Sequence, residues 1–242
     1  MAVIGTSGWM YDHWKGPFYP SGLETDAMLP TYAETFRSVE VNNTFYQLPD
    51  AEIVDGWRQR SPEGFIFAVK ANRYITHMKN LLEPEEPVAT MMDRMARLGD
   101  KLGPILFQLP PGWHVNADRL VAFTEILPES GRFAFEFRHP SWYVPEIYEI
   151  LTQHHCAFCI HDHADAPSPQ ETTAGFIYLR FHGPRGDYGD QYSRSILKEW
   201  AARIQSWQDG GQNVFAYFNN DAHGYAVENA RTLRSLLDIS TD

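Results

Sequence analysis

A glutamate and an arginine stand in a short segment that otherwise has the composition of a buried strand. Residues 132–138 read RFAFEFR, with three phenylalanines at alternate positions. Successive side chains of a strand point to opposite faces, so Glu136 and Arg138 lie on the face opposite the three phenylalanines. Isolated buried charges are costly, and such groups are normally paired or turned toward a ligand. The segment therefore predicts a polar site at the end of a strand.

Charged and amide side chains also close other strand-like segments. Glu40 and Asn42 share one face of a second segment. Arg180 and His182 share one face of a third, and Lys70 closes a fourth. Ligands of (β/α) barrels bind where the parallel strands end, so we predict that these groups meet in one polar, anion-binding pocket. The alternative is an internal ion network in which the charges only neutralise one another.

The residue types in this set suit several kinds of chemistry. The candidate catalytic residues are Glu40, Glu136 and His182, because a buried carboxylate or an imidazole can act as a general acid or base. Arginine and lysine can bind phosphate or carboxylate oxygens, and a lysine at a strand end can also form a Schiff base. Aromatic rings suit stacking on sugar or base faces. The candidate substrate-binding residues are Asn42, Tyr46, Lys70, Gln108, Arg138, His139, Arg180, Asn219, Asn220, Trp9 and Trp142.

Motifs for metals and organic cofactors are weak in this chain. The segment 154–163, HHCAFCIHDH, contains a C-x-x-C pair. Cys156 and Cys159 would point to opposite faces of a strand, so we expect buried structural cysteines rather than a zinc or redox site. No organic cofactor is implied. Carboxylate and histidine ligands suit divalent ions, so a divalent metal stays open as an alternative, although no local metal signature supports it.

Eight apolar, β-branched or aromatic segments recur along the chain and have the length of strands. They cover residues 2–8, 38–45, 65–70, 104–109, 132–138, 157–162, 176–182 and 213–220. Amphipathic segments separate most of them, and Asn116 and Ser193 suit helix caps. Alternating strands and helices predict a parallel sheet, and eight such units in about 250 residues are typical of a TIM-type (β/α)8 barrel of the α/β class.

One connection departs from this pattern. Residues 163–175, HADAPSPQETTAG, contain two prolines and little helical periodicity, so we expect the sixth helix to be missing or replaced by a loop. A doubly wound open sheet is the alternative fold. It is disfavoured because no glycine-rich phosphate turn follows the first strand.

Length and composition favour a single domain over residues 1–242. The chain has 43% hydrophobic residues, enough for one large core. No apolar run approaches the ~18 residues of a membrane span, and no signal-peptide pattern opens the sequence, so a cytoplasmic location and no membrane partner are expected. The formal net charge of −11 argues against a dedicated nucleic-acid binder, although a local basic cleft could still bind nucleic acid.

Several long motifs make the sequence resemble a known family. They are IGTSGW (4–9), GPFYP (16–20), VEVNNTFYQLP (39–49), FAVKANRYITH (67–77), LFQLPP (106–111), EFRHPSW (136–142), RFHG (180–183) and YFNNDAHGYAVENA (217–230). The chain resembles the YecE-like family, which is catalogued as a domain of unknown function (72). The resemblance covers almost the whole chain and implies a TIM-barrel-type fold with no agreed activity. It would place the family's signature positions at Glu40, Asn42, Tyr46, Lys70, Gln108, Glu136, Arg138, His139, Arg180, His182, Asn219 and Asn220.

Three functional hypotheses follow from these observations. The leading one is an enzyme, of the hydrolase, isomerase or lyase class, that acts on a small carbohydrate-like or phosphorylated metabolite in an aromatic-rimmed pocket. In it, Glu136 or Glu40 is the acid or base, and Arg138, Arg180 and their neighbours bind anionic oxygens. The second is a nucleic-acid-directed protein, metal-dependent or not, that resembles barrel-type repair endonucleases. The third is a non-catalytic ligand-binding module.

Overall fold

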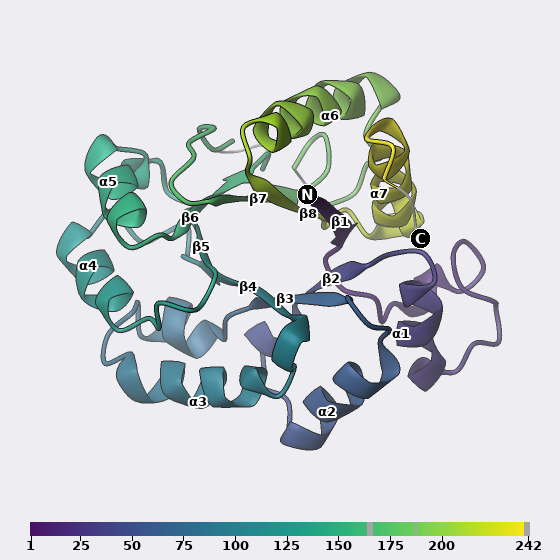
Figure 1. Cartoon of the computed structure of the whole chain (residues 1–242), viewed down its shortest axis with the longest axis horizontal. Coiled ribbons are helices and arrows are strands. Elements are labelled where there is room, and N and C mark those ends of the chain that lie inside the picture. Colours follow the sequence, from purple (N-terminus) through teal and green to yellow (C-terminus); the bar gives the residue numbers. More distant parts are fainter. Residues whose placement is uncertain (164–166, 187, 240–242) are drawn as a thin grey trace.

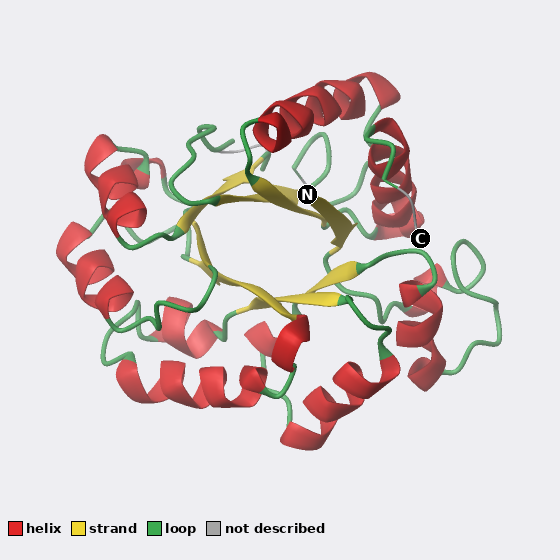
Figure 2. Ribbon diagram, in the orientation of Figure 1, coloured by secondary structure: helices red, strands yellow, loops and turns green. Residues whose placement is uncertain are grey.

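Eight parallel strands surround the centre of the molecule, and helices cover them from outside (Figures 1 and 2). The computed structural model describes residues 1–163, 167–186 and 188–239. The strands are β1 (Ala2–Thr6), β2 (Ser38–Val41), β3 (Ile66–Lys70), β4 (Leu102–Gln108), β5 (Phe133–Glu136), β6 (Ala157–His161), β7 (Phe176–Phe181) and β8 (Asn213–Phe218). The helices are α1 (Thr25–Ala33), α2 (Ala51–Arg60), α3 (Glu85–Ala96), α4 (Ala117–Glu125), α5 (Pro145–Gln153), α6 (Arg194–Asp209) and α7 (Tyr225–Leu236). The prediction of a TIM-type barrel is confirmed.

Local sequence signals account for several helix boundaries. The side chain of Asn116 accepts a hydrogen bond from the backbone N–H of Arg119 at 2.9 Å and caps α4. Ser193 caps α6 in the same way through the N–H of Ile196. Both caps bind backbone N–H groups that have no partner within the helix, so the two predicted starts are confirmed.

The connection between β6 and β7 contains no helix in its described part, residues 162–163 and 167–175, as predicted. Side chains of this loop bind the β6 backbone instead. The Thr173 hydroxyl accepts a hydrogen bond from the N–H of Phe158 at 2.8 Å and donates one to the carbonyl of Cys156 at 2.7 Å. The Ser168 hydroxyl accepts one from the N–H of His161 at 2.8 Å. A hydrogen-bonded loop therefore replaces the sixth helix.

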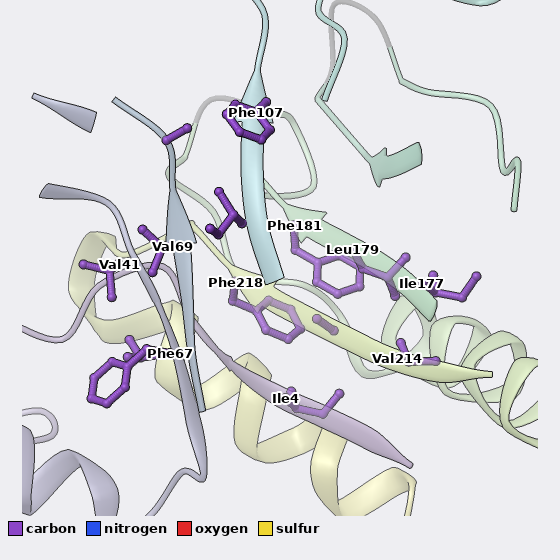
Figure 3. Close-up of a cluster of buried hydrophobic side chains, with 14 of the residues drawn as sticks. Ile4, Val41, Phe67, Val69, Phe107, Ile177, Leu179, Phe181, Val214 and Phe218 are labelled. Carbon is purple, nitrogen blue, oxygen red and sulfur yellow. The ribbon is translucent and has the colours of Figure 1, made fainter. Parts of the chain in front are cut away.

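Alternation along the strands divides the core into two layers. The outer layer packs between the strands and the helices and includes Phe133, Phe135 and Phe137 (part of this layer is drawn in Figure 3). The inner layer fills the barrel and includes Ala134 and Tyr178. The predicted phase of β5 is therefore confirmed, and it directs the side chains that follow Ala134 on the same face toward the barrel axis.

The two cysteines lie on opposite sides of the sheet. Cys156 belongs to the outer layer and Cys159 to the inner layer, and both are free and buried. Burial raises the pKa of each thiol, which disfavours the reactive thiolate. The prediction of structural cysteines is confirmed. Among the residues that the structure describes, no helix is both long and apolar enough to cross a membrane.

The barrel closes between β1 and β2, where a side chain replaces some of the backbone hydrogen bonds between the two strands. The Tyr32 hydroxyl accepts a hydrogen bond from the N–H of Thr6 and donates one to the carbonyl of Ser38, both at 3.0 Å. Further along, Ser7 and Glu40 form a parallel bridge, and the N–H of Gly8 donates to the carbonyl of Glu40 at 2.8 Å. This seam fixes Glu40 at the rim.

Gly5 is required at this seam. A Cβ atom at position 5 would lie 2.2 Å from the carbonyl oxygen of Ser38. We expect Gly5→Ala to lower the free energy of unfolding by about 1–3 kcal/mol, because β1 and β2 would have to separate. Urea denaturation measures the change. The control is Gly22→Ala, where an added Cβ meets no atom within 4 Å, and equal small effects in both variants would contradict the expectation.

Candidate functional site

A layer of charged side chains lies across the barrel where the strands end. Glu40 lies in β2, Glu136 ends β5 and Arg180 lies near the end of β7. Their side chains are fully buried, with exposed fractions of 0%, 0% and 1%. Residues that are 44 to 140 positions apart in the sequence therefore meet at the barrel axis, as the strand alternation predicted.

Arg180 lies between the two glutamates and binds both. Its Nε donates to Oε2 of Glu40 at 3.0 Å, and one terminal nitrogen donates to Oε1 of Glu40 at 2.8 Å. The other terminal nitrogen donates to Oε2 of Glu136 at 2.6 Å. A guanidinium has a fixed planar set of donors, so one arginine can orient two carboxylates at once.

The Glu40 carboxylate is saturated with donors. In addition to the Arg180 contacts, the Ser7 hydroxyl donates to Oε1 and the Tyr178 hydroxyl donates to Oε2, each at 2.7 Å. Tyr178 reaches up from the apolar layer inside the barrel. Donors therefore meet both oxygens, which leaves Glu40 poorly placed to exchange a proton with a substrate.

The Glu136 carboxylate is bound by two guanidinium groups and an amide. Arg138 donates from Nε, Gln108 donates from Nε2 at 2.8 Å, and Arg180 donates as described. Burial alone would raise the pKa of Glu136, but the charges of Arg138 and Arg180 hold the pKa well below its ordinary value. Glu136 therefore stays ionised at neutral pH, and the geometry favours a role in orienting the arginines over a role as proton donor.

Arg138 connects this network to the opening of the barrel. One of its terminal nitrogens lies 3.1 Å from Nε2 of His182, which is fully buried. Burial lowers the pKa of His182 well below its ordinary value, so the ring is neutral and Nε2 accepts this hydrogen bond. The Arg138 side chain is 10% exposed, whereas those of Glu136 and Arg180 are 0% and 1% exposed. Arg138 is therefore the guanidinium of the network that a ligand can reach.

A pocket of about 340 Å³ lies above this guanidinium. Its walls include Arg138, Gln108, His77 and Tyr188. Burial lowers the pKa of His77 to about 4, so its ring is neutral at pH 7. This volume lies within the range of small-molecule sites, and its place at the carboxyl ends of the strands matches the active-site end of TIM barrels. A larger hollow of about 430 Å³ lies near the start of β1, beside Met1, and is walled mainly by apolar side chains.

Lys70 lies beside the network at the end of β3. Its Nζ atom is 4.2 Å from the centroid of the Phe45 ring. That ring forms a T-shaped pair with the His77 ring at a centroid distance of 4.9 Å. Burial, with the nearby charge of Arg180, lowers the pKa of Lys70 to about 7. Lys70 thus lies beside the charged network, and its role as a ligand contact stays a prediction.

Two predicted substrate-binding rings lie in the core instead. Trp9 is 3% exposed and packs on Trp57 at a centroid distance of 5.6 Å. Trp142 is 0% exposed, stacks on Phe137 at 4.8 Å, and donates from Nε1 to the carbonyl of Trp113 at 2.8 Å. Because a ligand could reach neither ring, the assignment of Trp9 and Trp142 to the pocket is corrected. Both rings fasten loops to the barrel.

Other predicted residues also have partners within the protein. Asn220 is buried and donates to Asn229 at 2.9 Å and to the carbonyl of Asp190 at 2.8 Å, so it fixes loops. His139 caps a short 3-10 helix through the N–H of Ser141. The roles of His139 and Asn220 as ligand contacts stay predictions.

Three further predicted residues lie around the rim. Tyr46 is 69% exposed, and its ring lies 5.7 Å from the Arg73 guanidinium. Asn219 lies beside Nδ1 of His182 at 3.4 Å. The Oδ1 atom of Asn42 is buried without a hydrogen-bond partner in the described part of the chain. These residues stay predictions as ligand contacts.

His161 was not among the predicted site residues. Its Nε2 lies 3.0 Å from the carbonyl of Phe137, so this nitrogen carries the proton. Its Nδ1 then has a free lone pair and is buried without a partner among the described residues. The signal was present in the sequence, because His161 ends β6 and shares a strand face with the inner-layer residue Cys159.

The arrangement offers one set of ligand types for a divalent cation. One ligand atom each of Glu136, His161 and His182 lies within 4.8 Å of the others. Arg138, however, already donates to both Glu136 and His182. Its positive charge stands where a metal ion would bind, so metal binding would require this side chain to move. The described residues favour the arginine over a metal ion at this place.

Comparisons with known proteins place the chain in an established group. A family model described as "Protein of unknown function DUF72" matches residues 3–242. The chain is 28% identical over 272 residues to UPF0759 protein YunF of Bacillus subtilis (strain 168), covering 99% of this chain and 95% of that protein. It is 30% identical over 144 residues to UPF0759 protein YecE of Escherichia coli (strain K12), covering 59% of this chain and 50% of that protein.

Solved structures agree with this placement. A DUF72 family protein from Thermotoga maritima MSB8 has a TM-score of 0.88 and 29% identity, covering 98% of this chain and 99% of that chain. A glycoside hydrolase family 5 enzyme from Prevotella bryantii B14 has a TM-score of 0.55 and 11% identity, covering 97% of this chain and 95% of that chain. The second likeness concerns the barrel fold alone. The resemblance inferred from the sequence motifs is confirmed.

Proposed function

Because the chain belongs to the DUF72 family, whose description gives no activity, we propose a function from the geometry of its own site. The protein is an enzyme whose substrate is a small metabolite with a phosphate or carboxylate group. The substrate binds in the pocket at the carboxyl ends of the strands. The observation that carries the proposal is the position of Arg138, whose guanidinium lines the pocket while Glu136 and His182 fix its orientation.

The order of charges from the barrel axis outward favours an anion. The two carboxylates are fully buried, and Arg180 lies between them. Arg138 lines the pocket, and Lys70 lies beside the network at the end of β3. A ligand entering the pocket therefore meets the positive charge of Arg138, with the two carboxylates buried beneath it. Since the guanidinium is already held in place, little side-chain entropy is lost when an oxyanion binds.

The two glutamates act in this proposal as positioning residues. Each carboxylate is bound to Arg180, so the pair lacks the free acid and the free nucleophile or base that glycosidic hydrolysis requires. The groups that suit proton transfer are the neutral ring of His77 and the amine of Lys70. The exposed Tyr188 ring at the pocket wall suits contact with the face of a carbohydrate-like ligand.

Inorganic phosphate provides a direct test on the wild-type protein. Phosphate should raise the midpoint of thermal unfolding in a saturable manner, because a ligand at 100 times its Kd stabilises the folded state by about 2.7 kcal/mol. Sodium chloride at matched ionic strength is the control for screening. Equal effects of phosphate and chloride over this range would contradict an anion site.

A further inference from the structure

The Lys70 amine lies at the rim of the barrel without a carboxylate partner. Its side chain follows Ala68 of the inner layer toward the barrel axis. In the described part of the chain, no carboxylate oxygen lies within the 4.0 Å of an ion pair from its Nζ atom. The nearby carboxylates are bound by Arg180 and Arg138 instead. Lys70 is therefore a half-buried amine, and the nearby carboxylates are engaged by the two arginines.

The groups that face Lys70 come from several strands and act in opposite directions. Burial is the largest influence and lowers the pKa of Lys70 to about 7, with Arg180 and Arg138 acting in the same direction and Glu136 and Glu40 against it. An ordinary lysine has a pKa of about 10.4, so its amine is almost fully protonated at pH 7. The neutral form of Lys70 is far more populated, and that form is nucleophilic.

The surroundings of Lys70 connect it to the pocket. Its Nζ atom lies over the Phe45 ring at 4.2 Å, and the His77 ring forms a T-shaped pair with the same ring. His77 and Arg138 line the pocket. A ligand whose anionic group is bound at Arg138 would therefore extend toward the side of the pocket where the amine lies.

We propose that Lys70 forms a Schiff base with a small aldehyde or ketone that carries a phosphate or carboxylate group. This inference rests on the anion-binding function proposed above and names its substrate class. Barrel strands hold their terminal side chains rigidly, which is what a covalent step at a fixed distance from the anion requires.

The covalent step needs no further reactant. The lone pair of Nζ attacks the carbonyl carbon to form a C–N bond, and the carbonyl oxygen takes a proton to give a carbinolamine. The C–O bond then breaks, and the hydroxyl leaves as water with the proton that the nitrogen releases. The product is an imine between Lys70 and the substrate. The neutral ring of His77, at the wall of the pocket, can carry the proton between these groups.

Reductive trapping tests the proposal on the full chain. The protein is incubated with glycolaldehyde phosphate and sodium cyanoborohydride, and the modified lysine is located by peptide mass spectrometry. Lys70→Arg keeps the positive charge but cannot form an imine, and Lys79→Arg is the control at a surface lysine that is paired with Glu83 at 2.7 Å. Circular dichroism and thermal unfolding check that both variants fold.

We expect one adduct on Lys70 in the wild type and in Lys79→Arg, and its loss in Lys70→Arg. Glycolaldehyde without the phosphate should label Lys70 at least several-fold more slowly. If phosphate stabilises the wild type but the adduct is spread over other lysines or persists in Lys70→Arg, the Schiff-base proposal fails and the anion site stands. If both probes label Lys70 at equal rates, the substrate class proposed here is wrong.

Discussion

Replacement of Arg180 by methionine is expected to lower the free energy of unfolding by about 3–5 kcal/mol, because it leaves buried carboxylates without their shared counter-ion. Glu40 would retain only the hydroxyl donors of Ser7 and Tyr178. Glu136 would retain Arg138 and Gln108. Methionine preserves much of the side-chain volume, so the effect reports on charge more than on packing.

The pH dependence of this variant identifies the cause. In the wild type, the pKa of Glu136 is depressed on folding, so its contribution to stability is present above its unfolded pKa and is lost as the pH falls through the folded value. Without Arg180, the pKa of Glu136 rises and this contribution shrinks. The deficit of Arg180→Met against the wild type should therefore be largest at neutral pH and smaller near pH 4.

Urea denaturation of both proteins at pH 7 and pH 4 measures this deficit. Arg185→Met is the matched control, because the Arg185 side chain is 71% exposed and forms a surface ion pair with Asp190. A surface pair of this kind contributes about 0–1 kcal/mol. A deficit for Arg180→Met that is below about 1 kcal/mol, or that does not change with pH, would contradict the network described here.

Replacement of Arg138 by methionine is expected to weaken phosphate binding by at least roughly tenfold, which corresponds to about 1.4 kcal/mol. The variant should still fold, because Arg180 and Gln108 continue to donate to Glu136. The loss would therefore concern the group that reaches the pocket and leave the buried network in place. Among the polar groups of the pocket wall, Gln108 and the neutral ring of His77 would remain, and neither replaces the charge-assisted hydrogen bonds of Arg138.

The sequence was sufficient to predict the barrel and the inner face of its strands. Alternation in RFAFEFR placed Glu136 toward the barrel axis, and the helix caps at Asn116 and Ser193 were readable because they depend on local contacts. The convergence of Glu40, Glu136 and Arg180 also followed from their positions at strand ends. The strand faces follow from the two-residue alternation of side chains, and the helix caps follow from contacts within one helical turn.

The sequence could not predict which charges would pair or which rings would be buried. Arg180 binds residues on two other strands, and that choice depends on how the barrel closes between β1 and β2. Trp9 and Trp142 follow strands just as rim residues do, but their loops fold back onto the outer layer. The direction of a side chain on a loop depends on tertiary packing, and no periodic pattern in the sequence predicts it.

Calorimetric titration of phosphate into the wild type, Arg138→Met and Arg185→Met tests the central claim most directly, namely that a buried ion network holds one guanidinium ready for an anion. We predict saturable binding to the wild type and to Arg185→Met with the same Kd, and a Kd at least roughly tenfold higher for Arg138→Met. Equal affinities in all three proteins, or equal losses in both variants, would show that Arg138 does not hold the anion.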